Sequence, residues 1–329
     1  MGTSSFVAAL IMTAGLGAGI PDSVQEKQEK LFKEHLNKQF VWKYDKLPAK
    51  AKVPKHRTPY SGYIYPDTAG GCFNALKKYD AAFNGGRYAA AAHERWDTTA
   101  YTEVQRRGLF GFQRVSVIPY WHGHCNGWTS ATIRHAQPQK SVTHNGIVFS
   151  PADIKSLLAE IYIYNDIVNL CESGYYINAG NFHAVITNWV GRAGHPLGME
   201  ADPSAEKWNY PIYAYESKAT KYGNDRVDVQ MTITYAKDDN DGEDNKSKTV
   251  PLTKYFHYQL QLDEKGNITG GYFYRDSSRI DLVWLPLRPK ESKAEGNERG
   301  NPHVDIDQVL AIWRASVSEL HFRLSSRRC

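Results

Sequence analysis

Cys125 stands where a cysteine nucleophile would be useful. It lies between a turn and the start of an apolar helix expected over residues 128–136. A helix N-terminus lowers the pKa of a thiol, and the thiolate is the nucleophilic form. Gly123 and Gly127 allow close approach of a backbone, and the N–H of Cys125 is placed to hold an oxyanion. A lone cysteine at a helix start is more often a small buried apolar residue, so the assignment needs partner residues.

A nucleophilic cysteine needs a base, and the base needs a group that orients it. His183 lies in a run, residues 182–190, that the apolar pattern predicts to be a strand, and Asp202 lies beside Pro203 near the end of the next strand. Antiparallel neighbours can place such residues opposite one another. Each residue also has a purely structural alternative. For His183 it is a core histidine whose hydrogen bonds are satisfied, and for Asp202 it is a turn residue.

Metal binding is the rival use of this segment. His122, His124 and Cys125, with His135 beyond, contain zinc-ligand types, but His-Gly-His-Cys is not a common zinc spacing and two adjacent residues do not easily face one ion. The acidic loop 238–244 lacks the spacing of an EF-hand, so a solvated hairpin tip is favoured over a Ca²⁺ site. The sequence requires no cofactor, and the metal ligands and Ca²⁺ dependence are left open.

Cys, His and Asp in this order resemble the catalytic arrangement of the transglutaminase superfamily, whose fold is papain-like. Asn181-Phe182-His183 is similar to its histidine motif and Glu200-Ala201-Asp202-Pro203 to its aspartate motif. More narrowly, Trp208-Asn209-Tyr210-Pro211 resembles the Trp-Asn-Gln-Pro peptide of the oomycete-type transglutaminase elicitor family, with Tyr where that peptide has Gln. The resemblance covers about residues 70–317.

This resemblance implies a protein-glutamine gamma-glutamyltransferase that forms isopeptide cross-links. Cys125 would attack a glutamine carboxamide to form a thioester, His183 would keep the thiol ionised and shuttle a proton, and Asp202 would hold the histidine tautomer. Trp121, four residues before Cys125, would wall the site or stabilise the oxyanion, with plain packing as its alternative. The partners would be proteins with accessible Gln and Lys side chains.

Two other functions share the same residues. One is a cysteine protease or amidase of the same fold, because water can replace the amine when the site does not exclude it. The other is a secreted elicitor or binding protein in which the activity is secondary or lost. An intact Cys-His-Asp set favours an enzyme, because a pure binding module does not require it.

Composition excludes several classes of protein. The 40 Lys and Arg residues are scattered among 35 Asp and Glu residues, whereas a nucleic-acid binder usually concentrates its positive charge. The 21 Tyr, 12 Phe and 8 Trp residues give ample apolar area to bury, which excludes a wholly disordered chain. An integral membrane span is excluded, because no run of about 18 strongly apolar residues occurs. The oligomeric state is left open.

The elements that position these residues are expected to be helices first and strands afterwards, which predicts an α+β fold. The nucleophile helix would pack on an antiparallel sheet. Residues 227–235 alternate apolar with mostly polar side chains, as a half-buried strand does. The Ser150-Pro151-Ala152-Asp153 run predicts a helix N-terminus. Helices are expected near 23–40, 72–80, 88–96, 128–136, 151–168 and 305–317, and strands over 182–190, 227–235, 255–262 and 271–285.

The chain is divided into four parts on these patterns. Residues 1–20 form a signal or an N-terminal arm, and residues 21–60 a helix and linker that could serve as a pro-segment. Residues 61–290 form the catalytic domain, and residues 291–329 a linker, a C-terminal helix and a tail. The apolar run before residue 20 favours export, so a secreted or extracellular location is expected. If Cys125 is a free thiol, at most one disulfide forms among Cys72, Cys171 and Cys329, and the pairing is left open.

Overall fold

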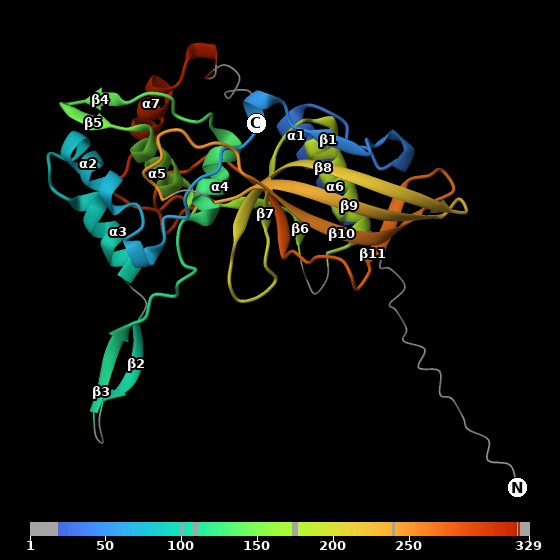
Figure 1. Cartoon of the computed structure of the whole chain (residues 1–329), viewed down its shortest axis with the longest axis horizontal. Helices are drawn as coiled ribbons and strands as arrows, with labels where there is room; N and C mark the ends of the chain where they lie inside the picture. Colours follow the sequence, from blue (N-terminus) through green and yellow to red (C-terminus); the bar gives the residue numbers. More distant parts are fainter. Residues whose placement is uncertain are drawn as a thin grey trace, which may run out of the picture.

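A computed structural model describes residues 19–99, 102–107, 111–172, 177–238, 241–320 and 322. Most of its helices gather at one end of the molecule and the long strands at the other (Figure 1). Each neighbouring pair of strands in the main sheet is antiparallel. The α+β class is confirmed. No helix in the described ranges is long and apolar enough to cross a membrane.

The main sheet contains eight strands among the described residues, in the order β11-β10-β9-β8-β7-β12-β6, with β1 paired to β8. Side chains along a strand alternate between the two faces of the sheet, and Val227, Val229, Met231 and Ile233 are all buried on one face of β9. The strands are β1 (Lys50–Lys52), β6 (Ile167–Glu172), β7 (Leu197–Glu200), β8 (Asn209–Tyr222), β9 (Arg226–Ala236), β10 (Pro251–Leu262), β11 (Ile268–Phe273) and β12 (Leu282–Pro286).

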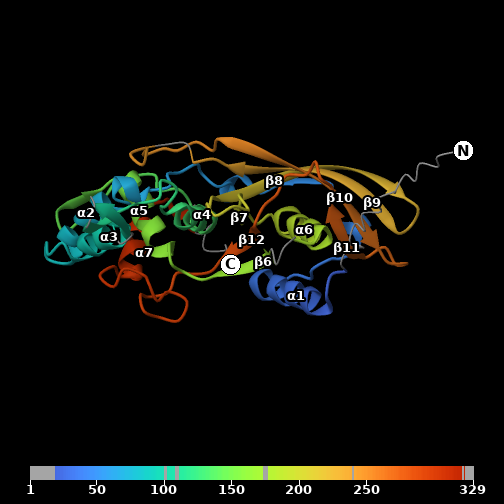
Figure 2. The same ribbon diagram turned by 90° about the horizontal axis from the view of Figure 1, so that it is seen from below.

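Two helices cover one face of this sheet. Helix α6 (Ala179–Ile186), which continues as a π-helical segment over Thr187–Arg192, lies between the sheet and α1 (Asp22–Leu36) (Figure 2). The rings of Phe32 on α1 and Trp189 after α6 meet edge to face, with centroids 5.2 Å apart. Burial of these aromatic side chains contributes to the apolar core at this end of the molecule.

The prediction of a strand over residues 182–190 is wrong, because this segment is the helix α6 and its extension. The side chain of Asn178 accepts hydrogen bonds from the backbone N–H groups of Gly180 and Asn181, which is a helix N-cap. All eight residues of α6 are buried, so the segment is buried on every side and its periodicity does not separate a buried strand from a buried helix. His183 therefore lies on a helix that packs against β10 and β11.

A second layer of helices has its own core cluster. Ser150 and Asp153 form a capping box at the start of one of these helices, as predicted, although this helix ends at Tyr162. Asp305 caps the last helix through the backbone N–H of Gln308. The layer consists of α2 (Phe73–Phe83), α3 (Ala89–Thr99), α4 (Cys125–Arg134), α5 (Pro151–Tyr162) and α7 (Ile306–Ser316), with the hairpins β2 (Thr102–Arg107), β3 (Gly111–Ser116) and β4 (Val142–His144), β5 (Ile147–Phe149).

Helix α4 joins the two layers. It packs on α5 on one side and on β7, β8 and β12 on the other. Its approach to α5 is close, because a Cβ atom at Gly127 would lie 2.2 Å from the carbonyl oxygen of Ala159. The prediction of a helix starting with or near Cys125 and packed on an antiparallel sheet is confirmed.

The N-terminal part of the described chain is built into the sheet core. Gly19 pairs with Gly270, and Ile20 is buried. Phe40 and Trp42 belong to the same apolar cluster as the sheet. Removal of residues 21–55 would therefore expose core side chains, and a pro-segment role for this region stays a prediction. Residues 1–18, on which the export prediction mainly rests, lie outside the described residues.

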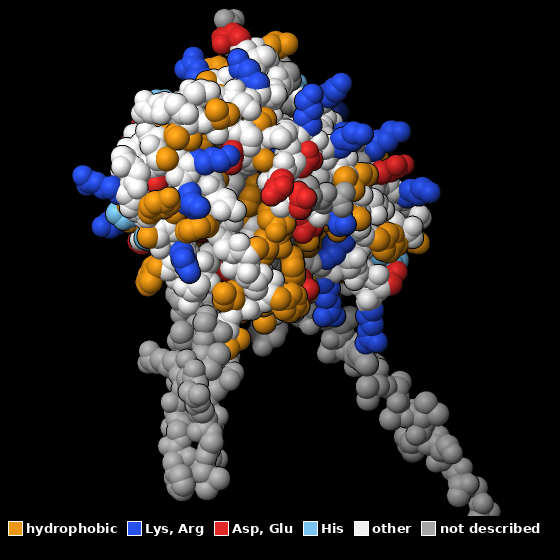
Figure 3. All heavy atoms as spheres, turned by 60° about the vertical axis from the view of Figure 1, so that its left-hand side comes forward, with side chains coloured by type: hydrophobic (Ala, Val, Ile, Leu, Met, Phe, Trp, Pro, Cys, Tyr) orange, Lys and Arg blue, Asp and Glu red, His pale blue; other side chains and the backbone are white. Residues whose placement is uncertain are grey.

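The cysteines and the surface add two observations. Cys72, Cys125 and Cys171 are buried and form no disulfide among the described residues, and Cys329 lies outside them. Lys and Arg side chains are spread over the face seen in Figure 3, with Asp and Glu side chains between them. This distribution agrees with the scatter of charge along the sequence.

The close packing of α6 on the sheet gives a test of the fold. A Cβ atom at Gly180 would lie 2.6 Å from the carbonyl oxygen of Gly270, a backbone atom that no side-chain rotation can move. We expect Gly180→Ala to lower the free energy of unfolding by about 1–3 kcal/mol through overpacking. Chemical denaturation measures this loss. Gly19→Ala, whose Cβ would make only an ordinary 3.6 Å contact, is the control, and equal stability of the two variants would contradict this packing.

Candidate active site

Cys125 is the first residue of α4, with His124 as the N-cap residue. Its side chain faces the sheet: Sγ lies 3.5 Å from the carbonyl oxygen of Lys207, to which the thiol donates, and 3.7 Å from Nδ2 of Asn209. Only 6% of Cys125 is exposed. The thiol thus occupies a covered position at the junction of the two layers, where a helix N-terminus presents backbone N–H groups that the helix itself does not use.

Asn209 is fixed in an orientation that points its amide nitrogen at the thiol. Trp284 donates its indole N–H to Oδ1 of Asn209 at 3.1 Å, so the NH₂ group is the part that faces Sγ. Thr129 on α4 donates to the backbone carbonyl of Asn209 at 3.0 Å. An amide N–H held in this way is the type of donor that stabilises a developing oxyanion. The sequence assigned no catalytic role to Asn209, although it lies within the Trp208–Pro211 run.

Two opposing effects act on the thiol of Cys125. Burial, the larger effect, raises its pKa, whereas hydrogen bonds from the backbone and side chain of Asn209 and from the backbone of Asn126 lower it. The same donors would stabilise a thiolate or the oxyanion of a tetrahedral intermediate once substrate is bound. The site therefore holds a protonated thiol among donors that are already oriented.

Asp202 lies on the loop of residues 201–208, which joins β7 to β8 and covers Cys125 through the Lys207 carbonyl. Its carboxylate accepts a hydrogen bond from the backbone N–H of Ser204 at 2.9 Å, as in an Asx-turn. The loop is tied to the segment before α4, because Tyr120 donates its hydroxyl to Glu206. Asp202 thus stands in a loop next to the thiol, with its side chain engaged by that loop.

Glu200, at the end of β7, is the buried carboxylate of this loop and was not predicted as a site residue. It accepts hydrogen bonds from the N–H groups of Asp202 and Trp208 and from Nζ of Lys207, at 3.1–3.2 Å. Burial raises its pKa to about 7. Lys207 also binds Asp281 at 2.7 Å, so an ion-pair network anchors the loop over the thiol.

Trp121 is half-buried, and its ring packs edge-on against the ring of His122, with centroids 4.1 Å apart. It neighbours Tyr120, which contacts the covering loop. This placement suits a wall of the site. A direct role in oxyanion stabilisation stays a prediction.

His183 lies in the sheet core. Its Nδ1 is 2.7 Å from the hydroxyl of Tyr258 on β10, and its ring lies 5.7 Å from that of Tyr44. Burial lowers the pKa of His183 to about 3, so the imidazole is neutral at physiological pH. Within the described ranges, no hydrogen bond or ring contact joins His183 to Cys125 or to Asp202, so this structure does not bring the three predicted residues together.

The alternative zinc set is also separated. His124 points into the helical layer while Cys125 points to the sheet, because adjacent residues at the start of a helix face different directions. His135 instead pairs through Nε2 with the hydroxyl of Tyr162 at 2.8 Å. Part of the acidic loop 238–244, namely residues 239–240, lies outside the described residues.

His124 meets a second cysteine, Cys72, which precedes α2. Cys72 is only 1% exposed, and burial raises the pKa of its thiol to about 11 despite the neighbouring histidine. Its Sγ donates to the carbonyl oxygen of Ser156. A buried thiol held protonated in this way is a poor nucleophile.

The anchoring of the covering loop gives a prediction about access to Cys125. Lys207→Ala removes the ion pairs to Glu200 and Asp281 and should favour loop opening by about 0.5–1 kcal/mol, which corresponds to a roughly 2- to 5-fold faster alkylation of Cys125. Peptide mass spectrometry after limiting iodoacetamide measures the rate at each cysteine. Lys221→Ala, which removes a surface pair with Asp45, is the control. An unchanged rate in Lys207→Ala would show that the loop does not limit access.

Comparisons with known proteins give two matches. Residues 104–176, which include Cys125, match the sequence model of the family described as "Transglutaminase elicitor". The fold matches the crystal structure of the GP42 transglutaminase from Phytophthora sojae, with a TM-score of 0.68 and 17% sequence identity, over 91% of this chain and 99% of that chain. A search of curated proteins found no match. The resemblance to the oomycete-type transglutaminase elicitors is confirmed, and the chain shares the fold of an oomycete transglutaminase over nearly its whole length.

Proposed function

We propose that this protein is a transglutaminase-type acyltransferase, which cross-links proteins through a thioester on Cys125. The observation that carries the proposal is the position of Cys125. It begins α4, it is hydrogen-bonded by the fixed amide of Asn209, and it lies within the segment that matches the elicitor family. The transglutaminase fold of the chain supports the same chemistry.

The proposed reaction has two steps. In the first, the Cys125 sulfur attacks the carboxamide carbon of a protein glutamine and a C–S bond forms. The C–N bond breaks, and the proton lost by the thiol goes to the leaving nitrogen, which departs as ammonia. In the second, a lysine amine attacks the thioester, the C–S bond breaks, and the sulfur regains a proton as the isopeptide bond forms. The Asn209 amide and the N–H groups at the start of α4 would hold the oxyanion in both steps.

His183 is the proposed base, and Asp202 is the proposed residue that orients it. This proposal rests on the order of the three residues in the chain and on the resemblance. In this geometry His183 is bonded to Tyr258, so a role as base requires the ring to leave that partner. Trp121 is the proposed wall of the site. These roles are tested separately from the role of Cys125.

Amine transfer is favoured over hydrolysis by the cover on the thiol. Cys125 is almost fully buried beneath the loop 201–208, and exclusion of water protects a thioester from hydrolysis. The proposed partners are proteins with accessible Gln and Lys side chains, in an extracellular setting that the apolar N-terminal run favours. A hydrolase on the same cysteine, and an elicitor or binding protein without activity, are the alternatives that the experiment separates.

Incorporation of a fluorescent primary amine into casein tests the reaction. The full chain should label casein, and Cys125→Ala should reduce labelling to background, because no thioester can form. The assay is run with Ca²⁺ and with EDTA, so that metal dependence is measured at the same time.

Cys171→Ser is the matched control, because Cys171 is also a buried cysteine but lies in β6. Ammonia release or casein cleavage without labelling would replace the proposal with a hydrolase on the same cysteine. The absence of every activity in a folded chain would favour the elicitor or binding protein.

The role of His183 gives a further prediction. If His183 acts as the base, the kcat of His183→Gln falls by more than the decrease in the folded fraction explains. The substitution also removes a buried hydrogen bond to Tyr258, so a cost of about 1–3 kcal/mol in stability is expected in either case. The measurement is therefore kcat per folded molecule, with the folded fraction taken from circular dichroism. An unchanged kcat per folded molecule would restrict His183 to the sheet core.

A further inference from the structure

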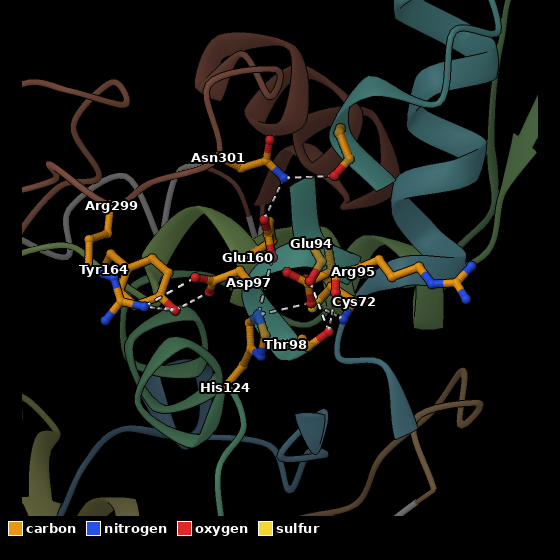
Figure 4. Close-up of polar contacts among 12 residues, drawn as sticks. Cys72, Glu94, Arg95, Asp97, Thr98, His124, Glu160, Tyr164, Arg299 and Asn301 are labelled. Atoms are coloured by element: carbon orange, nitrogen blue, oxygen red, sulfur yellow. Dashed lines mark hydrogen bonds and ion pairs between the residues drawn. The ribbon is translucent and has the colours of Figure 1, made fainter. Parts of the chain in front are cut away.

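Four buried side chains with metal-binding atoms meet inside the helical layer. They are Cys72 before α2, Glu94 on α3, His124 at the N-cap of α4 and Glu160 on α5. One ligand atom of each lies within 4.8 Å of all the others. Figure 4 shows the ring of His124 directed toward the carboxylates of Glu94 and Glu160. This cluster shares only His124 with the zinc set considered from the sequence.

The spacing of these atoms suits a small tetrahedral cation. Nε2 of His124 is 3.3 Å from Oε1 of Glu94 and 3.2 Å from Oε2 of Glu160. Ligands bonded to Zn²⁺ at about 2.0–2.1 Å in a tetrahedron lie about 3.3–3.4 Å apart. The observed separations are longer than the usual N–H···O distance of about 2.9–3.0 Å. Nε2 of His124 is therefore as far from each of the two carboxylate oxygens as two ligands of one ion would be.

The buried acidic groups of the cluster also favour a bound cation. Each of its four members is almost fully buried, and ionisation of Cys72, Glu94 and Glu160 would place several negative charges together. In the part of the chain that the structure describes, neither carboxylate has an ion pair with Lys or Arg, and His124 is their shared partner. Buried charges of this kind are stable when they coordinate a metal or retain protons.

The groups around the cluster hold two of its members in place. Asn301 donates its side-chain N–H to Oε1 of Glu160 at 3.0 Å, which leaves Oε2 directed at His124. The backbone N–H of Cys72 donates to Oε1 of Glu94 at 2.6 Å. Such outer hydrogen bonds orient the ligands of metal sites.

The lack of a side chain at Gly71 leaves the space that the cluster occupies. Its φ is +57°, and a Cβ atom there would lie 2.0 Å from Oε1 of Glu94 and 3.1 Å from the His124 ring. A cavity of about 430 Å³ is lined by Gly71, Cys72 and Ser156, and it gives an ion a route to the thiol.

We propose that Cys72, Glu94, His124 and Glu160 bind one Zn²⁺ ion. Thiolate and imidazole ligands favour Zn²⁺ over Ca²⁺ or Mg²⁺, which prefer oxygen ligands alone. The ion would join α2, α3, α4 and α5 at the residue that precedes Cys125, and so hold the start of α4 in place. This site does not depend on the proposed acyl transfer.

The test is the zinc content and stability of the full chain. After treatment with EDTA, dialysis, and addition of equimolar ZnCl₂ followed by desalting, we expect about one zinc per chain by plasma mass spectrometry and a higher melting temperature. Cys72→Ser and the isosteric Glu160→Gln should each lower zinc retention at least about 10-fold, in line with the loss of a ligand. X-ray absorption at the zinc edge should show one sulfur ligand.

Cys171→Ser is the control, because it removes a buried thiol outside the cluster and should retain zinc. Circular dichroism of the metal-free variants establishes that they are folded. The proposal is overturned if the wild-type chain retains no zinc or if the two ligand variants retain as much zinc as the wild type. It is also overturned if the X-ray absorption spectrum shows no sulfur ligand on the zinc. Failure to bind zinc would leave a proton-sharing cluster around His124 and would not affect the test of Cys125.

Discussion

The start of α4 is the constraint on which the rest of the site depends. Two adjacent residues there face opposite layers of the molecule: His124 enters the polar cluster of the helical layer, and Cys125 faces the sheet. Because one planar peptide unit joins them, a constraint on the backbone of His124 also limits where the backbone N–H of Cys125 can lie. The candidate active site and the candidate zinc site are therefore coupled through one helix end, even though they contain different residues.

The packing of α4 explains why this helix end is held so firmly. Gly127 allows α4 to lie against the backbone of α5, and Thr129 binds the backbone carbonyl of Asn209 on β8. Asn209 is in turn held by Trp284 on β12. The thiol consequently meets an amide whose orientation is set by the sheet, and the loop 201–208 closes over it. Such an arrangement provides oriented donors without the need for rearrangement when charge develops.

Sequence reasoning identified the features with local signals. The alternation in β9 and the cap at Ser150 are short-range patterns, and each is present in the structure. The segment 182–190 was assigned to the wrong element because it is buried on every side, so its periodicity carried no information. The capping side chain of Asn178 was the signal that would have indicated a helix.

The residues that were missed have no local signal. His124 was considered as a metal ligand, but with other partners. Cys72, Glu94 and Glu160 come from widely separated parts of the chain, and only tertiary packing brings them within reach of it. Asn209 lies in a run that the sequence singled out, but its role depends on β8 and β12 lying beneath α4. The Cys125, His183 and Asp202 set was built from order in the chain, and order does not determine which face of which element each side chain occupies.

The central claim is that Cys125 carries the acyl group, and the most direct measurement is the mass of the trapped intermediate. The folded chain is mixed with a glutamine-containing peptide in the absence of an amine, quenched in acid, digested and analysed by mass spectrometry. The account predicts that the peptide containing Cys125 gains the mass of the glutamine peptide less one ammonia. The same mass on Cys72 or Cys171, or ammonia release with no mass on Cys125, would contradict it.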